Sequence, residues 1–254
     1  MSKKFGEVKG PFIVWLFVVT YFAIPILFVG FSRGTLPQEV TVSLVLNLLI
    51  AIVSGWGGIL VFLFVFLAFW EKRRSISEIF SSVGLRRKGV VKSVFWSIVI
   101  TPLFLVIIGL ITVMFIHFLG PIPILDSGPN NGQPPLWFPY YMIIYSFFPV
   151  AVVEEVISRG YVLDRLMPQH PSSLIKASPA ILLSSLLFTL YHVPSYLRLY
   201  TLSPPWIIAL LAGNVFPWSV ALSIAYVRAR TRNAIGLVLI HFLLDSIPFI
   251  LMLT

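Results

Sequence analysis

The chain of 254 residues contains no cysteine. This absence excludes disulfide bonds, cysteine nucleophiles and thiolate metal sites. Charged residues are also scarce, at 11% of the chain, whereas 58% of the residues are hydrophobic. Soluble domains typically contain about 25% charged residues, so the composition argues against a soluble protein.

Long apolar runs occupy most of the chain, at roughly 11–32, 41–70, 93–119, 136–158, 179–197, 205–227 and 233–253. A membrane-spanning helix needs about 20 apolar residues. The runs lack the alternation of barrel strands, and backbone groups in lipid must pair within their own element. The sequence therefore predicts an all-α, polytopic transmembrane helical bundle of about seven spans, with no sheet. Gly213 and Pro217 could kink or split the sixth run, which would give eight elements.

Acidic residues are half as frequent as basic ones, and the net charge is +9. If the N-terminus is cytoplasmic, every lysine and arginine except Arg33 and Arg198 falls on the cytoplasmic side of the seven spans. This asymmetry predicts a cytoplasmic N-terminus and an extracytoplasmic C-terminus. The basic excess is thus interpreted as a signal for membrane lipids, with no nucleic-acid partner.

The first cytoplasmic loop, "EKRRSISEIFSSVGLRRKGVVK", carries basic clusters on both sides of an apolar pattern. Ile76, Ile79, Phe80 and Val83 recur at helical spacing. The pattern predicts a short helix that lies in the membrane interface.

Three acidic residues, Glu154, Glu155 and Asp245, fall within the late apolar runs, which also contain His192 and His241. An ionisable side chain at the centre of a bilayer costs about 2.5–3.5 kcal/mol on insertion scales. Such residues therefore indicate a functional site.

The stretch "VAVVEEVISRGYVLDRL" places two glutamates next to each other, but a helix directs them about 100° apart. Glu155 and Arg159 have the i, i+4 spacing of an ion pair. Glu154 has no basic residue at i+3 or i+4, so we expect it to be the available carboxylate. Because Glu154 would otherwise be too shallow, we expect the helix to continue past Arg159 through Leu166.

The two histidines lie in runs with a partner one turn away. Phe188 precedes His192 in "FTLYH", and His241 precedes Asp245 in "HFLLD". Asp245 could orient His241, join a proton path or ligate a metal. Either histidine could alternatively serve only as a structural hydrogen-bonding group between helices.

Together these side chains are the parts of a hydrolytic site. Glu154 could accept a proton from water with the help of His192, and donors at His241 and its neighbour could stabilise an oxyanion. A glutamate with two histidines also resembles a zinc set, although "HExxH" is absent, so zinc-activated water is an open alternative.

The motifs "EEVISR", "FTLYH" and "HFLLD" occur in that order on successive late runs. In this arrangement the chain resembles the CAAX prenyl endopeptidase and bacteriocin-processing (CPBP, or Abi) family of intramembrane glutamate proteases. "VGLRRK", residues 83–88, resembles a segment often found upstream in that family. The resemblance covers about residues 136–250.

The resemblance implies residue roles. Glu154 and His192 would activate water, and His241 with position 245 would form the oxyanion site. Glu155 and Arg159 would support the site, with Phe188 beside His192. The family commonly has asparagine at position 245. An ionised Asp245 cannot donate to an oxyanion, so it must be protonated, orient His241 or help to hold a metal.

The sequence therefore predicts a single integral membrane domain, 1–254. Residues 1–135 would form the N-terminal spans and the basic loop, and residues 136–254 the catalytic core. The predicted activity is cleavage of a membrane-associated, CAAX-type or otherwise lipidated peptide or protein at the cytoplasmic side. The alternatives are a non-enzymatic membrane protein, such as a transporter or immunity factor, and a zinc-dependent membrane protease.

Overall fold

The computed structural model describes residues 57–69, 71–73, 75–120, 138–168, 173–199 and 204–253, all within the unit Val42–Thr254. These residues form helices and short connections, and no strand occurs among them. The predicted all-α class is therefore confirmed. The predicted run 11–32 and the first part of 41–70 lie outside the described residues.

The first described helices lie within the basic loop and on either side of it. They are α3 (Gly57–Phe69), α4 (Ile76–Ser82) and α5 (Val90–Leu119). The short helix predicted in the loop is α4, which begins after Ser75, whose hydroxyl accepts a hydrogen bond from the backbone nitrogen of Glu78 at 3.2 Å. Such a cap satisfies one of the free N–H groups at the start of a helix. The location of α4 in the membrane interface remains a prediction.

The next helix runs without a break from Phe138 to Leu166. It contains α6 (Phe138–Tyr145), η2 (Ser146–Val152), α7 (Val153–Glu155), η3 (Val156–Leu163) and α8 (Asp164–Leu166). The prediction that this span continues past Arg159 is confirmed. Segments η2 and η3 are π-helical and lie on either side of the two glutamates. Such wider turns are uncommon and occur frequently at functional sites.

The last helices are α9 (Leu174–Leu199), the continuous helix Pro204–Ala229 and α12 (Ile235–Leu251). The helix Pro204–Ala229 contains α10 (Pro204–Leu210), η4 (Leu211–Val215) and α11 (Phe216–Ala229). It is not split at Gly213 and Pro217. Because Pro217 has no N–H to offer the carbonyl of Gly213, the irregularity is accommodated by the π-helical turn η4.

Four of these helices are long and apolar enough to cross a membrane: Val90–Leu119, Phe138–Leu166, Leu174–Val193 and Pro204–Ala229. The apolar helix α12 is shorter, with 17 residues. These helices agree with an integral membrane protein, and the count of seven spans stays a prediction.

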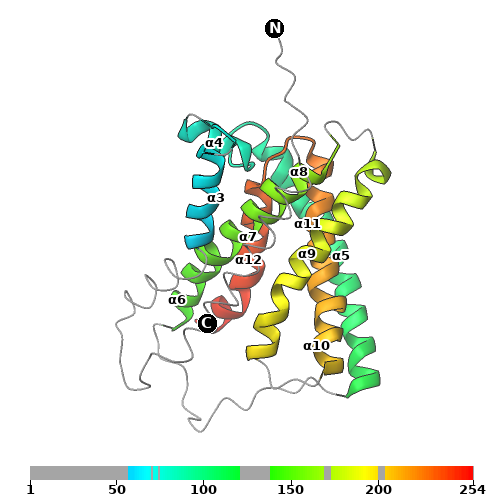
Figure 1. Cartoon of the computed structure of the whole chain (residues 1–254). Helices are drawn as coiled ribbons and strands as arrows, with labels where there is room; N and C mark the ends of the chain where they lie inside the picture. The colour runs from blue at the N-terminus through cyan, green and yellow to red at the C-terminus, as the bar shows by residue number, and fades with distance from the viewer. Residues whose placement is uncertain are drawn as a thin grey trace. The chain divides into compact units, whose positions relative to one another are not determined.

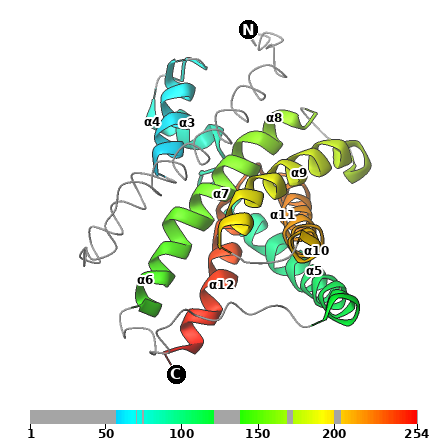
Figure 2. The ribbon, with the colours of Figure 1, turned by 60° about the horizontal axis from the view of Figure 1, so that its bottom comes forward.

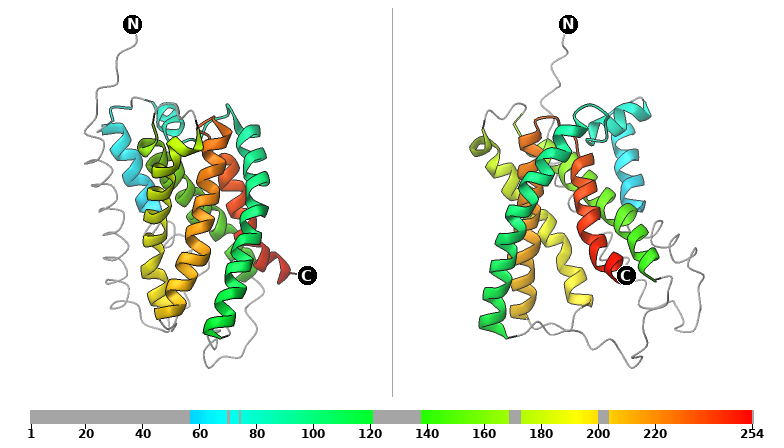
Figure 3. Two further views of the ribbon diagram at one scale, coloured as in Figure 1. Left: turned by 90° about the vertical axis from the view of Figure 1, so that its right-hand side faces the viewer. Right: turned by 180° about the vertical axis from the view of Figure 1, so that it is seen from behind.

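Helix α11 lies between α5 and α9, and α5 also packs against α12 (Figures 1, 2 and 3). Helix α12 in turn packs against η2 of the helix 138–166, so the two helices that carry the acidic motifs are neighbours. Small residues allow these contacts. A Cβ on Gly213 would lie 2.6 Å from the ring of Phe115, and one on Gly236 would lie 2.3 Å from the backbone of Ser93.

Helix α5 has three small polar side chains on the inside. Ser93, Ser97 and Thr101 are its buried residues, whereas apolar side chains such as Val106 and Leu110 are exposed. This pattern is the reverse of that in a soluble protein. It is typical of a helix whose outer face contacts lipid and whose inner face approaches its neighbours through small residues.

Candidate active site

Glu154 and Glu155 are buried in α7, with only 3% and 0% of their surface exposed, and Arg159 follows one turn later in η3. The predicted ion pair is present, with Nη1 of Arg159 2.9 Å from Oε1 of Glu155. The other terminal nitrogen of Arg159 donates to the hydroxyl and the backbone carbonyl of Ser219 in α11. The pair therefore links two helices in a place that water does not reach.

Phe188 explains the spacing of the second motif. Its backbone carbonyl lies 2.8 Å from Nδ1 of His192, one turn later in α9. Its ring lies 4.6 Å from the imidazole of His192, and the guanidinium of Arg159 lies over it, 4.4 Å from its centroid. Phe188 thus connects the histidine to the arginine of the first motif by an aromatic contact and a cation–π contact.

The tautomer of His192 follows from this geometry. A carbonyl oxygen can only accept, so Nδ1 of His192 carries a proton and donates it to Phe188. In the neutral ring Nε2 is then an acceptor. It faces Oε1 of Glu154 at a distance of 3.7 Å.

His241 lies among three carboxylates. Its Nδ1 is 2.8 Å from Oε1 of Glu155, and its Nε2 is 3.8 Å from Oε2 of Glu154 and 3.4 Å from Oδ2 of Asp245. The ring is buried, and Trp218 packs against it at 5.9 Å. The expected proximity of Asp245 to His241 is therefore present, but Glu155 contacts the other ring nitrogen and orients the ring from the opposite side.

A pocket of about 320 Å³ contains Glu154, His192, His241 and Asp245. The structure thus brings together all four residues that the sequence suggested for the chemistry. The rest of the lining is mainly apolar and includes Leu105, Ile108, Val150, Phe188, Val215 and Leu244. Among the described residues, no lysine or arginine lines this pocket.

Sequence reasoning missed three further polar residues of the pocket, Tyr196, Asn214 and Trp218. Asn214 lies in the π-helical turn η4, and its Oδ1 is 3.1 Å from the hydroxyl of Thr112 in α5. Asn214 could have been noticed as an amide within an apolar run, next to Gly213. Its partner belongs to another helix, however, and no spacing within the run predicts that contact.

Zinc, if bound here, would meet Nε2 of the two histidines and the carboxylate of Glu154. Nδ1 of each histidine is occupied, by the carbonyl of Phe188 in one ring and by the carboxylate of Glu155 in the other. Among the described residues, no group of three or more histidine, aspartate or glutamate side chains is arranged to hold a metal ion. Zinc dependence remains the open alternative that the sequence left.

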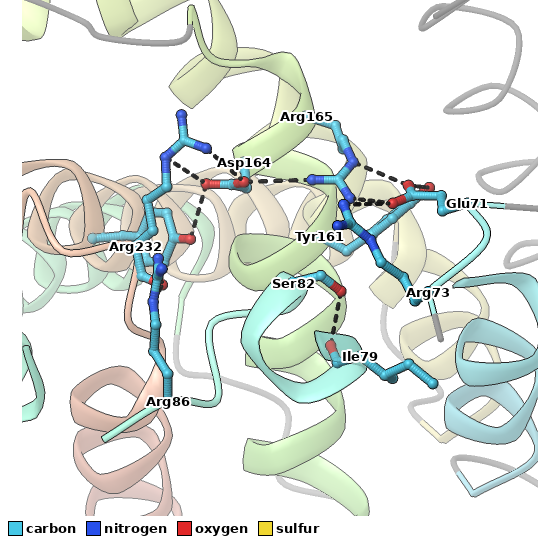
Figure 4. A network of polar contacts seen from close by, with 10 residues as sticks. Glu71, Arg73, Ile79, Ser82, Arg86, Tyr161, Asp164, Arg165 and Arg232 are labelled. Carbon is cyan, nitrogen blue, oxygen red and sulfur yellow. Dashed lines mark hydrogen bonds and ion pairs between the residues drawn. The ribbon is translucent and has the colours of Figure 1, made fainter. Parts of the chain in front are cut away.

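A second polar cluster lies at the end of the helix 138–166 (Figure 4). Asp164 is contacted by Arg165, by Arg232 and by the hydroxyl of Tyr226. Arg165 also pairs with Glu71, at 2.6 Å. These contacts join the basic loop, the end of the first-motif helix and the connection between α11 and α12.

In a comparison with protein-family models, residues 135–247 match the model described as Rce1-like, type II CAAX prenyl endopeptidase. The matched region includes all three motifs and every residue of the pocket except those in α5. No curated protein and no solved structure gave a significant match. The match confirms the family that the motifs predicted, because residues 135–247 fit the Rce1-like CAAX prenyl endopeptidase model.

Proposed function

We propose that the protein is an intramembrane endopeptidase in which Glu154 and His192 activate a water molecule. The observation that carries the proposal is the position of one buried carboxylate between two imidazoles. Glu154 directs Oε1 toward Nε2 of His192, at 3.7 Å, and Oε2 toward Nε2 of His241, at 3.8 Å. A general base must lie within hydrogen-bond reach of the proton that it removes.

A water molecule fits between Glu154 and His192. Because Oε1 and Nε2 are 3.7 Å apart, one water oxygen can lie at about 2.8 Å from both atoms. Both atoms are acceptors, so the water donates one proton to each. Its lone pair is then free to point toward a substrate carbonyl.

The reaction begins when the water oxygen forms a bond to the carbonyl carbon of the peptide. One water proton passes to Glu154, and the carbonyl oxygen becomes an oxyanion. Glu154 then transfers this proton to the amide nitrogen, and the C–N bond breaks. The products are a carboxyl group and an amine, so the atoms and protons balance without a covalent enzyme intermediate.

His241 is the proposed oxyanion donor. Carboxylate oxygens face both of its ring nitrogens, and ionised carboxylates only accept hydrogen bonds. When both nitrogens carry protons the ring is a cation, which can stabilise an oxyanion near Nε2. Asp245 would then act by keeping His241 a donor and would not need to donate itself.

The proposed substrate is a membrane-associated peptide, such as a lipidated CAAX-type sequence, cut at the cytoplasmic side. The family description and the mainly apolar lining of the pocket support this class. The basic residues indicate which side is cytoplasmic. They gather where α5 and α12 begin and α8 and α11 end, which is the same end of the helices (Figure 1): Arg86, Lys92, Arg165, Arg228 and Arg230.

The test is hydrolysis of a prenylated fluorogenic peptide by the protein purified in detergent. Glu154→Gln keeps the shape of the side chain but removes the base, and we expect it to lower kcat by at least about 10²-fold. Glu78→Gln, an exposed position in α4, is the matched control and is expected to behave as wild type. Equal activity of wild type and Glu154→Gln would contradict the mechanism. An inactive wild-type protein would favour a non-enzymatic membrane protein.

A further inference from the structure

The segment "VGLRRKG", residues 83–89, lies between α4 and α5 in the chain. It contacts the helix that carries Glu154 and the connection that leads into the helix of His241, and the mechanism above does not use it. It is called the 83–89 strap below. We propose that the 83–89 strap is a positioning element, which sets the distance between Glu154 and His241 and thereby the rate of the chemical step. This inference rests on the proposed function for its kinetic effect, but its structural effect is independent of that function.

One end of the strap contacts the helix of the first motif. Val83 is fully buried, and its carbonyl lies directly against Gly160 in η3. A Cβ at Gly160 would lie 2.0 Å from that oxygen, so only glycine permits the approach. Gly160 follows Arg159, and Glu154 lies six residues before it, about 9 Å along a helix.

The rest of the strap binds the connection that leads into α12. The carbonyl of Gly84 accepts a hydrogen bond from the backbone nitrogen of Ala234 at 2.9 Å. Arg86 donates two hydrogen bonds to the carbonyl of Arg232, at 3.1 and 2.7 Å. The amide of Asn233 donates to the carbonyls of Arg86 and Lys88.

Asn233 links the 83–89 strap to the start of α12 by hydrogen bonds. It is fully buried, and its Oδ1 accepts a hydrogen bond from the backbone nitrogen of Ile235, the first residue of the helix. Its own carbonyl accepts from the hydroxyl of Ser93 in α5. His241 lies seven residues after Ala234, about 10 Å along the helix.

The backbone of the strap is shaped for these contacts. Gly84 and Gly89 have left-handed φ values of 79° and 86°. A Cβ at Gly84 would lie 3.1 Å from the nitrogen of Ala234, and a Cβ at Gly89 would lie 2.4 Å from the side chain of Thr231. Glycine adopts such φ values without a steric penalty and permits both close contacts.

The 83–89 strap therefore contacts each helix near a reacting group. Gly160 lies less than two helical turns from Glu154, and Ala234 lies less than two helical turns from His241. A displacement of about 1 Å in an active site can lower a rate by about 10²-fold. Arg232 also pairs with Asp164, four residues after Gly160, so the same connection is tied to the first-motif helix by a second route (Figure 4).

The experiment compares Gly160→Ala with Gly109→Ala. A Cβ at Gly109, in α5, would have no atom within 4 Å, so this variant controls for the loss of a helical glycine. Because the chain has no cysteine, Ile144→Cys and Leu243→Cys provide two sites for spin labels on the first-motif helix and on α12. Both side chains are exposed.

We expect Gly160→Ala to change the distance between the labels and to lower kcat by about 10²-fold with a smaller change in KM. Gly109→Ala is expected to change neither. Arg86→Gln, which removes two hydrogen bonds without adding bulk, provides a second variant if Gly160→Ala does not fold. It should change the label distance, and Arg86→Lys should restore part of the wild-type distance.

An unchanged label distance in both Gly160→Ala and Arg86→Gln would overturn the proposal, as would a changed distance with wild-type kcat. If the wild-type protein has no protease activity, the proposed function fails. The label distances then still decide whether residues 83–89 position the two helices.

Discussion

Oε1 of Glu155 lies 2.8 Å from Nδ1 of His241, although 86 positions separate the two residues. The same oxygen accepts a hydrogen bond from Arg159. Glu155 therefore joins the arginine of the first motif to the histidine of the third. The two neighbouring glutamates have different surroundings, because Glu155 contacts Arg159 and His241, whereas Glu154 faces Nε2 of His192 and Nε2 of His241.

This difference predicts that two isosteric substitutions differ in their effect on stability. Glu155→Gln leaves Arg159 without its buried counter-charge, and breaking a buried ion pair typically costs about 3–5 kcal/mol. We expect this variant to lose both activity and thermal stability. Glu154→Gln should lose activity only, because Glu154 forms no ion pair with an arginine or lysine among the described residues. Thermal unfolding in detergent together with peptide hydrolysis measures both properties. Equal melting temperatures for the two variants would contradict the assignment.

Asp245 is predicted to act through hydrogen bonding to His241 and not through a negative charge at the oxyanion. Asp245→Asn retains an acceptor for Nε2 and adds N–H groups that can donate, so we expect it to keep most of the activity. Asp245→Leu has neither, so the Nε2–H of His241 loses the acceptor that orients it, and a misplaced catalytic group can lower kcat by about 10²-fold. Steady-state hydrolysis compares the two variants. If asparagine is as harmful as leucine, the negative charge itself is needed.

The ring of Phe188 is predicted to hold Arg159 and His192 in place. Phe188→Leu removes the aromatic face over which the guanidinium lies, a contact worth about 0.5–2 kcal/mol. We expect kcat to fall by about tenfold, since about 1.4 kcal/mol corresponds to a factor of ten. Phe188→Tyr keeps the ring and provides the control. Loss of activity in both variants would indicate a packing defect unrelated to the cation–π contact.

Chelation is predicted to leave hydrolysis unchanged. The proposed mechanism activates water with the carboxylate of Glu154 and Nε2 of His192 and needs no metal ion. The measurement is peptide hydrolysis after exhaustive treatment with a chelator, combined with elemental analysis of the purified protein. Loss of activity that added zinc restores would support the zinc-dependent alternative instead.

The orientation of the helices can be measured in a chain without cysteine. Lys88→Cys lies at the predicted cytoplasmic end, and Leu253→Cys at the opposite end. A membrane-impermeant maleimide should label Lys88→Cys in inside-out vesicles only and Leu253→Cys in right-side-out vesicles only. The reverse pattern would contradict the predicted orientation of the helices.

The sequence by itself determined the helical class, the family and the contacts within one helix. Pairs at i, i+4, such as Glu155 with Arg159 and His241 with Asp245, follow from the pitch of a helix and need no knowledge of its neighbours. The continuation of the first-motif helix through Leu166 was also predictable, because the residues 161–166 that follow Gly160 have good helix propensity up to Pro168. The sequence indicated neither the π-helical turns beside the glutamates nor their exact bounds.

Only the tertiary structure decided which motifs contact each other. The bond between Glu155 and His241, the place of Asn214 in the pocket and the contacts of residues 83–89 all join separate helices. These contacts depend on how closely the helices approach. That distance is set by small residues such as Gly160 and Gly236, whose Cα atoms face the backbone of another segment. No periodicity along the chain records which segment that will be.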